Sequence, residues 1–133
     1  YEKNNPNLLI MKGDRLVQDS FDGELAMVFA VKGRGLVILS GCAHVGIVNI
    51  VKHALAMTGI SRIHAIIGGF HLVNARKDVV DRSIENIRSF APDYIVPAHC
   101  TGFETVVRFA REMPDQFILN TAGTRYSFGA GEG

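Results

Sequence analysis

Three apolar runs of this sequence each end in side chains that bind metals well. "GLVILSGCAHVG" ends in Cys42 and His44, "RIHAIIGGFHLV" ends in His71, and "YIVPAHCTGFET" ends in His99 and Cys100. Neutral imidazole is a good ligand for zinc and iron, and a hydrolytic zinc takes about three protein ligands and keeps one position open for water. A single histidine after a strand is more often structural, but three in equivalent positions favour a metal site.

The three runs are expected to be parallel strands. The segments 36–39, 65–67 and 94–96 are continuously apolar, which is typical of strands that are buried on both faces. Neighbouring strand ends lie about 4.8 Å apart, and ligands of open α/β sheets bind in the crevice beyond the carboxyl ends of the strands. The three histidines should therefore meet around one ion if the strands are parallel neighbours.

Amphipathic spacing predicts helices over 46–58, 78–90 and 102–112. Thr101 and Glu104 have the spacing of a capping box, which predicts the start of the third helix. The apolar face of that helix is expected to consist of four residues, Phe103, Val106, Val107 and Ala110.

The rest of the chain is expected to add strands. Segments 15–21, 24–32 and 35–41 resemble antiparallel strands, and "QFILN" and "TRYSF" near the end predict two more at an edge. The fold class is therefore α/β, with N-terminal antiparallel strands followed by βα units.

The remaining histidines and the two cysteines have other expected roles. His53 and His64 are expected to be structural, because the first lies beside a helix face and the second inside a strand. Cys42 and Cys100 flank the predicted site. They either help to tune or bind the metal, or serve as small buried hydrophobes.

Positive charge near the second strand end suggests a place for an anionic substrate. Arg76 and Lys77 could contact such a group, or they are solvated loop charges. The N-termini of the helices that follow His44 and His99 offer a second place for a phosphate or carboxylate. Asp78 is expected to cap its helix.

Composition limits the partners of this chain. Its 133 residues fit one domain, and a net charge of +1 with 20% charged residues gives no footprint for nucleic acid or a membrane surface. No apolar run approaches the roughly 20 residues of a membrane helix. Two cysteines and no leader sequence suggest a reducing, cytoplasmic location and a small-molecule partner.

The motifs "SGCAHVGIVN", "IIGGFHL" and "VPAHCTG", in this order, resemble the C-terminal half of metallo-β-lactamase-fold proteins over about residues 22–128. Within that family, the motifs look most like the dihydropteroate synthase-like subgroup, which is related to a dihydropterin/ribofuranosylaminobenzene phosphate synthase. The resemblance implies half of an αββα sandwich and a metal-dependent hydrolase. It also implies a divalent metal, with zinc expected before manganese or iron, that activates water against a small, phosphorylated or pterin-like substrate. By motif, His44 and His99 would be metal ligands, and His71 a ligand or a residue that supports one.

Two departures limit what this chain can do alone. The His-x-His-x-Asp-His run of the superfamily is absent, and so is its late bridging aspartate. Residues 1–133, which open with "YEKNNPN", are therefore expected to form a single domain that is the C-terminal part of a longer protein and is inactive by itself. Its uncovered sheet face predicts a homo-oligomer or pairing with the missing N-terminal half. The alternative is a non-catalytic α/β module that oligomerises and has structural histidines.

Overall fold

A four-stranded sheet forms the centre of the computed structural model, which describes residues 1–2 and 7–129. Its strands, in spatial order, are β3 (Ala26–Val31), β4 (Gly35–Ser40), β5 (Ile63–Gly69) and β6 (Tyr94–Ala98). β3 and β4 are antiparallel, whereas β4, β5 and β6 are parallel neighbours. The predicted order of antiparallel strands followed by βα units is confirmed.

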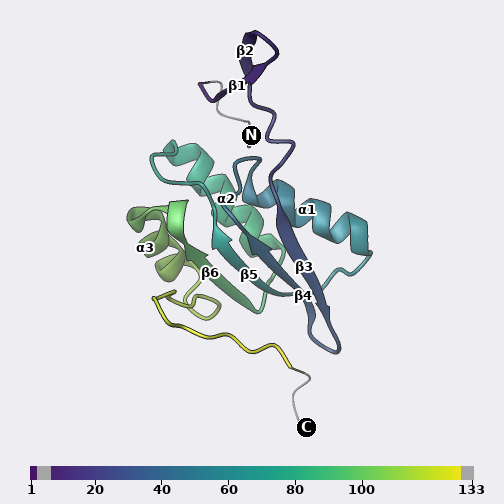
Figure 1. Cartoon of the computed structure of the whole chain (residues 1–133). Helices are drawn as coiled ribbons and strands as arrows, with labels where there is room; N and C mark the ends of the chain where they lie inside the picture. Colours follow the sequence, from purple (N-terminus) through teal and green to yellow (C-terminus); the bar gives the residue numbers. More distant parts are fainter. Residues whose placement is uncertain (3–6, 130–133) are drawn as a thin grey trace.

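Three helices cover one face of this sheet (Figure 1). They are α1 (Ile47–Thr58), α2 (Lys77–Ser89) and α3 (Phe103–Glu112), each within two residues of its predicted bounds. Their apolar sides and the facing strand residues form the buried core, which includes Leu36, Ile38, Val51, Ile66, Ile84, Ile87 and Ile95. Within the described part of the chain, no helix is long and apolar enough to cross a membrane.

The helix α3 buries a different face from the predicted one. Phe103 is 83% exposed, whereas Thr105 and Phe109 are buried. Phe109 packs edge-on against Phe70, with ring centroids 5.5 Å apart. The prediction of this face was wrong, because two apolar stripes compete on the helix and only tertiary packing chooses between them.

The predicted capping box at the start of α3 is also wrong. The N-cap is Gly102, and no side chain from the described part of the chain caps the helix. The hydroxyl of Thr101 donates to the carbonyl of Ala98 (2.7 Å) and accepts from the amide of Phe70 (3.1 Å). Thr101 therefore ties the end of β6 to the loop after β5 instead of capping the helix.

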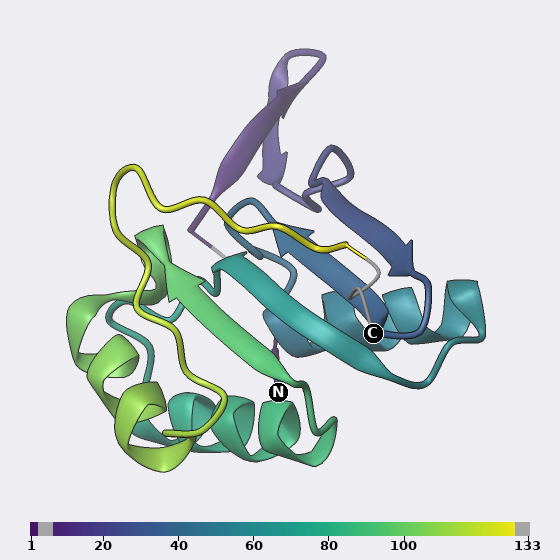
Figure 2. The ribbon, with the colours of Figure 1, turned by 90° about the horizontal axis from the view of Figure 1, so that it is seen from below.

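The sheet face opposite the helices is apolar and partly open. Strand register places Phe29, Val37, Ala65 and Tyr94 in one row across it, and the outer members are 50% and 40% exposed. The C-terminal segment crosses this face without forming the two predicted edge strands (Figure 2). Within the described residues of this segment, a single bridge between Ile95 and Phe117 is the only pairing with β6, so that prediction was wrong.

A small hairpin precedes the main sheet and projects from it (Figure 1). Its strands are β1 (Leu9–Lys12) and β2 (Arg15–Gln18), joined at Gly13 with φ 62°. The strand predicted over 15–21 is shorter than expected, and its partner β1 was missed. A glycine–aspartate pair between two apolar runs is the sequence signal for such a turn.

Candidate metal site at the strand ends

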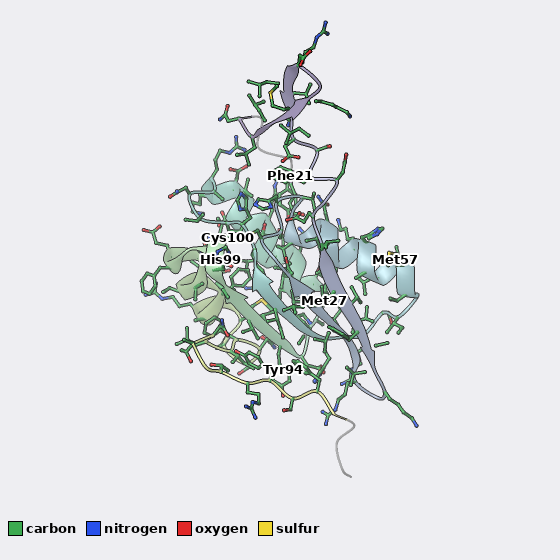
Figure 3. All side chains as sticks on the ribbon, in the orientation of Figure 1. Phe21, Met27, Met57, Tyr94, His99 and Cys100 are labelled. Carbon is green, nitrogen blue, oxygen red and sulfur yellow. The ribbon has the colours of Figure 1, made fainter. Side chains whose placement is uncertain are left out.

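The carboxyl ends of β4, β5 and β6 meet at one edge of the sheet. Strand register aligns Ser40 with Gly68, and Gly68 with Pro97. Figure 3 shows His99 and Cys100 toward this end and Tyr94, the first residue of β6, toward the other. The three strands are therefore parallel neighbours whose carboxyl ends lie at one edge, which confirms the condition for their convergence.

Each strand end turns through a left-handed residue that is not glycine. Ala43, His71 and His99 have φ values of 60°, 49° and 49°. Such a conformation costs about 1–3 kcal/mol and persists where the surroundings fix it. The loops that carry the histidines are therefore held in defined positions.

Glu24 holds His44 in place. The Nδ1 of His44 donates to the Glu24 carboxylate (2.9 Å), which also accepts from the amides of His44 (2.6 Å) and Val45 (2.8 Å). Phe21 stacks on the imidazole with ring centroids 4.7 Å apart. A ligand histidine commonly donates its second ring nitrogen to a carboxylate, so Nε2 of His44 is left for an ion.

His71 lies beside His44, with ring centroids 4.6 Å apart. Its Nδ1 is buried and has no hydrogen-bond partner among the described residues. Burial lowers the pKa of His71, and His44 lowers it further. A neutral imidazole with an unpartnered nitrogen suits a metal ligand. We call His44 and His71 the histidine pair, and its donor set fits a divalent ion.

The imidazole of His99 lies beside a cysteine sulfur. Its Nδ1 lies 3.6 Å from Sγ of Cys42, and the thiol of Cys100 donates to the carbonyl of Cys42 (3.2 Å). One donor atom from each of Cys42, His99 and Cys100 lies within 4.8 Å of the others, whereas the three histidines form no such group among the described residues. We call these three residues the sulfur cluster. Burial raises the pKa of the Cys100 thiol.

Gly69 makes room for the sulfur cluster. Cys42 and Cys100 follow β4 and β6, which lie on either side of β5. A Cβ on Gly69, at the end of β5, would lie 2.7 Å from Sγ of Cys100 and 3.2 Å from Cα of Cys42. The two thiols therefore meet across a strand end that has no side chain.

The N-terminus of α1 is already occupied by a carboxylate of this chain. Glu2 accepts from the amides of Val48 (3.0 Å) and Asn49 (2.8 Å), and its burial raises the pKa of its carboxyl group. The position where an anion was expected to bind at this helix is therefore occupied by the Glu2 carboxylate of the same chain. Among the described residues, no side chain caps the N-terminus of α3 at Gly102.

Arg76 and Lys77 are both exposed and paired. Arg76 contacts Asp78 (2.7 Å) and Lys77 contacts Asp81 (2.7 Å). Asp78 makes no capping hydrogen bond to α2, whose N-cap is Arg76, so that expectation was wrong. Lys77 also lines a cleft of about 360 Å³ with Phe103.

The two other histidines lie outside both clusters. His53 is exposed on α1. His64 is buried, and its Nδ1 lies 2.7 Å from the Asp93 carboxylate. This contact fits the structural role expected for His64.

Glu24 is the site residue that sequence reasoning missed. It precedes His44 by 20 positions and belongs to no motif. Ala26 pairs with Ser40 in the β3–β4 hairpin, so extending the register by two residues places Glu24 opposite Cys42. Hairpin register was thus the signal that could have found it.

Known proteins resemble this chain in sequence and in fold. It is 33% identical over 118 residues to 7,8-dihydropterin-6-methyl-4-(beta-D-ribofuranosyl)-aminobenzene-5'-phosphate synthase of Methanocaldococcus jannaschii, covering 89% of this chain and 40% of that protein. It is 28% identical over 111 residues to an uncharacterized protein of the same organism, covering 84% of this chain and 40% of the relative. No protein-family model matches the sequence.

A solved structure has the same fold as this chain. The crystal structure of a metal-dependent hydrolase of the beta-lactamase superfamily superposes with a TM-score of 0.85 at 29% identity, over 92% of this chain and 47% of that one. The chain therefore spans less than half the length of the proteins it matches.

Proposed function

We propose, from the metallo-β-lactamase-type α/β fold of this chain, that it is the C-terminal part of a metal-dependent hydrolase and supplies His44, His71 and His99 to the metal centre. The observation that carries this proposal is the histidine pair, where the Glu24 carboxylate fixes one ring and the other has a buried, unpartnered nitrogen. A divalent ion bound there, zinc before manganese or iron, would act as a Lewis acid and lower the pKa of water. The missing ligands make this chain inactive alone.

Each residue of the pair has a defined task in this proposal. Glu24 keeps the Nδ1 proton on His44 and so directs Nε2 toward the ion. Phe21 covers one face of the His44 ring and excludes water from it. The low pKa of His71, caused by burial, keeps that imidazole neutral and able to bind.

The substrate is proposed to be a small phosphorylated or pterin-like molecule. This proposal rests on the similarity to the dihydropterin-related synthase and on the cleft beside the strand ends. The side chain of Lys77 and the uncapped N-terminus of α3 border that cleft and suit an anionic group. The pair of Lys77 with Asp81 is exposed and screened by solvent, so an anion can displace it.

Zinc titration tests the ligand assignment. We use a background with Cys42→Ser and Cys100→Ser, so that zinc held by sulfur does not contribute to the calorimetric signal. In this background His44→Ala should weaken zinc binding at least tenfold, and Glu24→Gln should weaken it about 10- to 100-fold, because the carboxylate orients the ligand. His53→Ala, at an exposed position of α1, is the control and should leave zinc binding unchanged.

The non-catalytic alternative predicts a different outcome of this titration. If the histidines are only structural, His44→Ala lowers the urea midpoint while the zinc affinity of the background stays the same. That result would contradict the proposal that His44 binds a metal ion.

The exposed apolar residues on the sheet face opposite the helices suggest which partner binds this chain. We propose that the remaining part of the αββα sandwich covers the exposed Phe29 and Tyr94, because the chain spans 47% of the solved hydrolase and this sheet face exposes large apolar side chains. The segment encoded upstream of Tyr1 should then contain a His-x-His-x-Asp-His run and bind this chain one to one.

Co-expression of that segment with this chain checks the proposed pairing. Phe29→Lys should abolish co-purification, since a charge on the covered face cannot be desolvated cheaply. Met57→Lys, at an apolar residue of α1 that is even more exposed than Phe29 (66% against 50%), should have no effect. A stable homodimer that is broken by Phe29→Lys would point to a second copy as the occupant instead.

A further inference from the structure

A pocket lies at the end of the sheet opposite the candidate metal site, where the parallel strands begin. Arg34 precedes β4, His64 is the second residue of β5, and Tyr94 is the first of β6. These residues and residues 125–129 of the C-terminal segment, which crosses the sheet face in Figure 2, line the pocket. Its volume is about 330 Å³, which is large enough for a small molecule.

A buried histidine lines this pocket. His64 is 6% exposed, and its Nδ1 lies 2.7 Å from the Asp93 carboxylate. Because an ionised carboxylate only accepts hydrogen bonds, Nδ1 is the donor. The amide of Asp93 donates to the carbonyl of Ile63 (3.1 Å), which holds the carboxylate beside the ring. Nε2 makes no hydrogen bond with the described residues, so this nitrogen is left for a ligand.

An irregularity in β5 determines which way His64 points. Ile63 and Ala65 have partners in β4, whereas the register passes over His64. Ile63 and Ile66 both belong to the core on the helix side, which regular alternation along a strand does not allow. The extra residue is therefore a β-bulge, a feature that re-aims side chains beside functional sites.

The pocket carries positive charge. Arg34 and Arg125 line it, and both side chains are exposed. Neither guanidinium forms an ion pair with the described residues, and none of the described residues that line the pocket is acidic. Guanidinium groups bind phosphate and carboxylate oxygens through two parallel hydrogen bonds. The charge of the lining therefore favours an anion.

Aromatic rings supply the apolar part of the wall. Tyr94 and Phe128 meet the His64 ring edge-on, with centroids 5.4 and 5.8 Å from it. Tyr126 lies nearly parallel to Phe128, at an angle of 15° and a centroid distance of 6.5 Å. Aromatic side chains pack well against other planar rings, stacked or edge-on. The wall therefore suits a ligand that has a planar ring.

We propose that this pocket binds a small aromatic phosphate, a molecule with a planar ring and a phosphate group. Two guanidinium groups and one imidazole suit the three terminal oxygens of a phosphate better than the two of a carboxylate. Nε2 of His64 accepts a hydrogen bond from a protonated phosphate oxygen, or donates one when the ring is protonated. The ligand ring packs against Phe128 and Tyr94, and Tyr94 also borders the face proposed to receive the partner. The site uses neither the histidine pair nor a metal, so it does not rest on the proposed hydrolase function.

Calorimetry with phenyl phosphate tests the proposal. In the presence of EDTA, phenyl phosphate should bind the full chain at one equivalent, at least tenfold more tightly than inorganic phosphate or phenol. Arg34→Ala and Arg125→Ala should each weaken binding about tenfold, because each removes charge-assisted hydrogen bonds. Arg125→Lys should recover part of the loss. Arg111→Ala, at an exposed arginine of α3 that does not line the pocket, is the matched control and should leave the affinity unchanged.

Further variants distinguish this pocket from the cleft at the other end of the sheet. Lys77→Ala and His44→Ala should retain the affinity for phenyl phosphate. Phe128→Ala should lower that affinity to the level of inorganic phosphate, because only the contact with the ring is lost. Three results would each overturn the proposal: no binding by the full chain, equally tight binding of phenol, or binding that is lost with Lys77→Ala and retained with Arg125→Ala.

Discussion

Replacing Gly68 with alanine is expected to destabilise the fold by about 4 kcal/mol or more, in the range reserved for severe steric and strain effects. Gly68 has φ 124°, and its added Cβ would overlap the backbone carbonyl of Ser40 in the adjacent strand. Because β4 and β5 are central strands with register fixed on both sides, neither backbone can move away. Urea unfolding followed by circular dichroism measures the loss.

Gly59→Ala is the matched control for this effect. Gly59 ends α1 with φ 68°, but an added Cβ meets nothing within 4 Å. Its substitution therefore carries the conformational cost alone, about 1 kcal/mol. Equal losses for the two variants would contradict the close approach of β4 to Gly68.

Replacing Phe109 with alanine is expected to cost about 3–5 kcal/mol, as for other large core residues. Phe109 is fully buried and packs against Phe70, so its removal leaves a cavity between α3 and the sheet. Phe103→Ala, on the exposed side of the same helix, should change stability by less than about 0.5 kcal/mol. The measurement is again the free energy of unfolding in urea.

These two phenylalanines decide the orientation of α3. The sequence pattern assigns Phe103 to the core and the structure assigns Phe109. A larger loss for Phe103→Ala than for Phe109→Ala would mean that the helix is rotated relative to the structure.

The elements that the sequence predicted well are those with strong local patterns. Continuous apolar strands and amphipathic helices predicted β4, β5, β6 and the three helices within two residues at the helix ends. The C-terminal segment failed because "QFILN" is apolar enough to pair, yet only Phe117 bridges to β6 among its described residues. Apolar character indicates burial there, but it does not fix hydrogen bonding.

For the candidate site, too, the sequence predicted some features and missed others. The motif spacing predicted that His44 and His71 approach each other, since parallel strand ends meet at one edge. It did not predict Glu24, or the contact of His99 with Cys42, because both depend on loop conformation and on the register of a hairpin. Left-handed turns at non-glycine residues are rarely evident from residue type.

The left-handed turns at the strand ends lower stability, but two of them carry the histidines that the candidate metal site needs. Glycine would relieve the backbone strain at His71 and His99, since it adopts positive φ without cost. It would also remove the imidazoles, so selection for thermal stability alone would erase both donors. Ala43 has the same backbone conformation and no donor atom to lose. A stabilised version of this protein should therefore begin with the alanine turn and leave the two histidine turns strained.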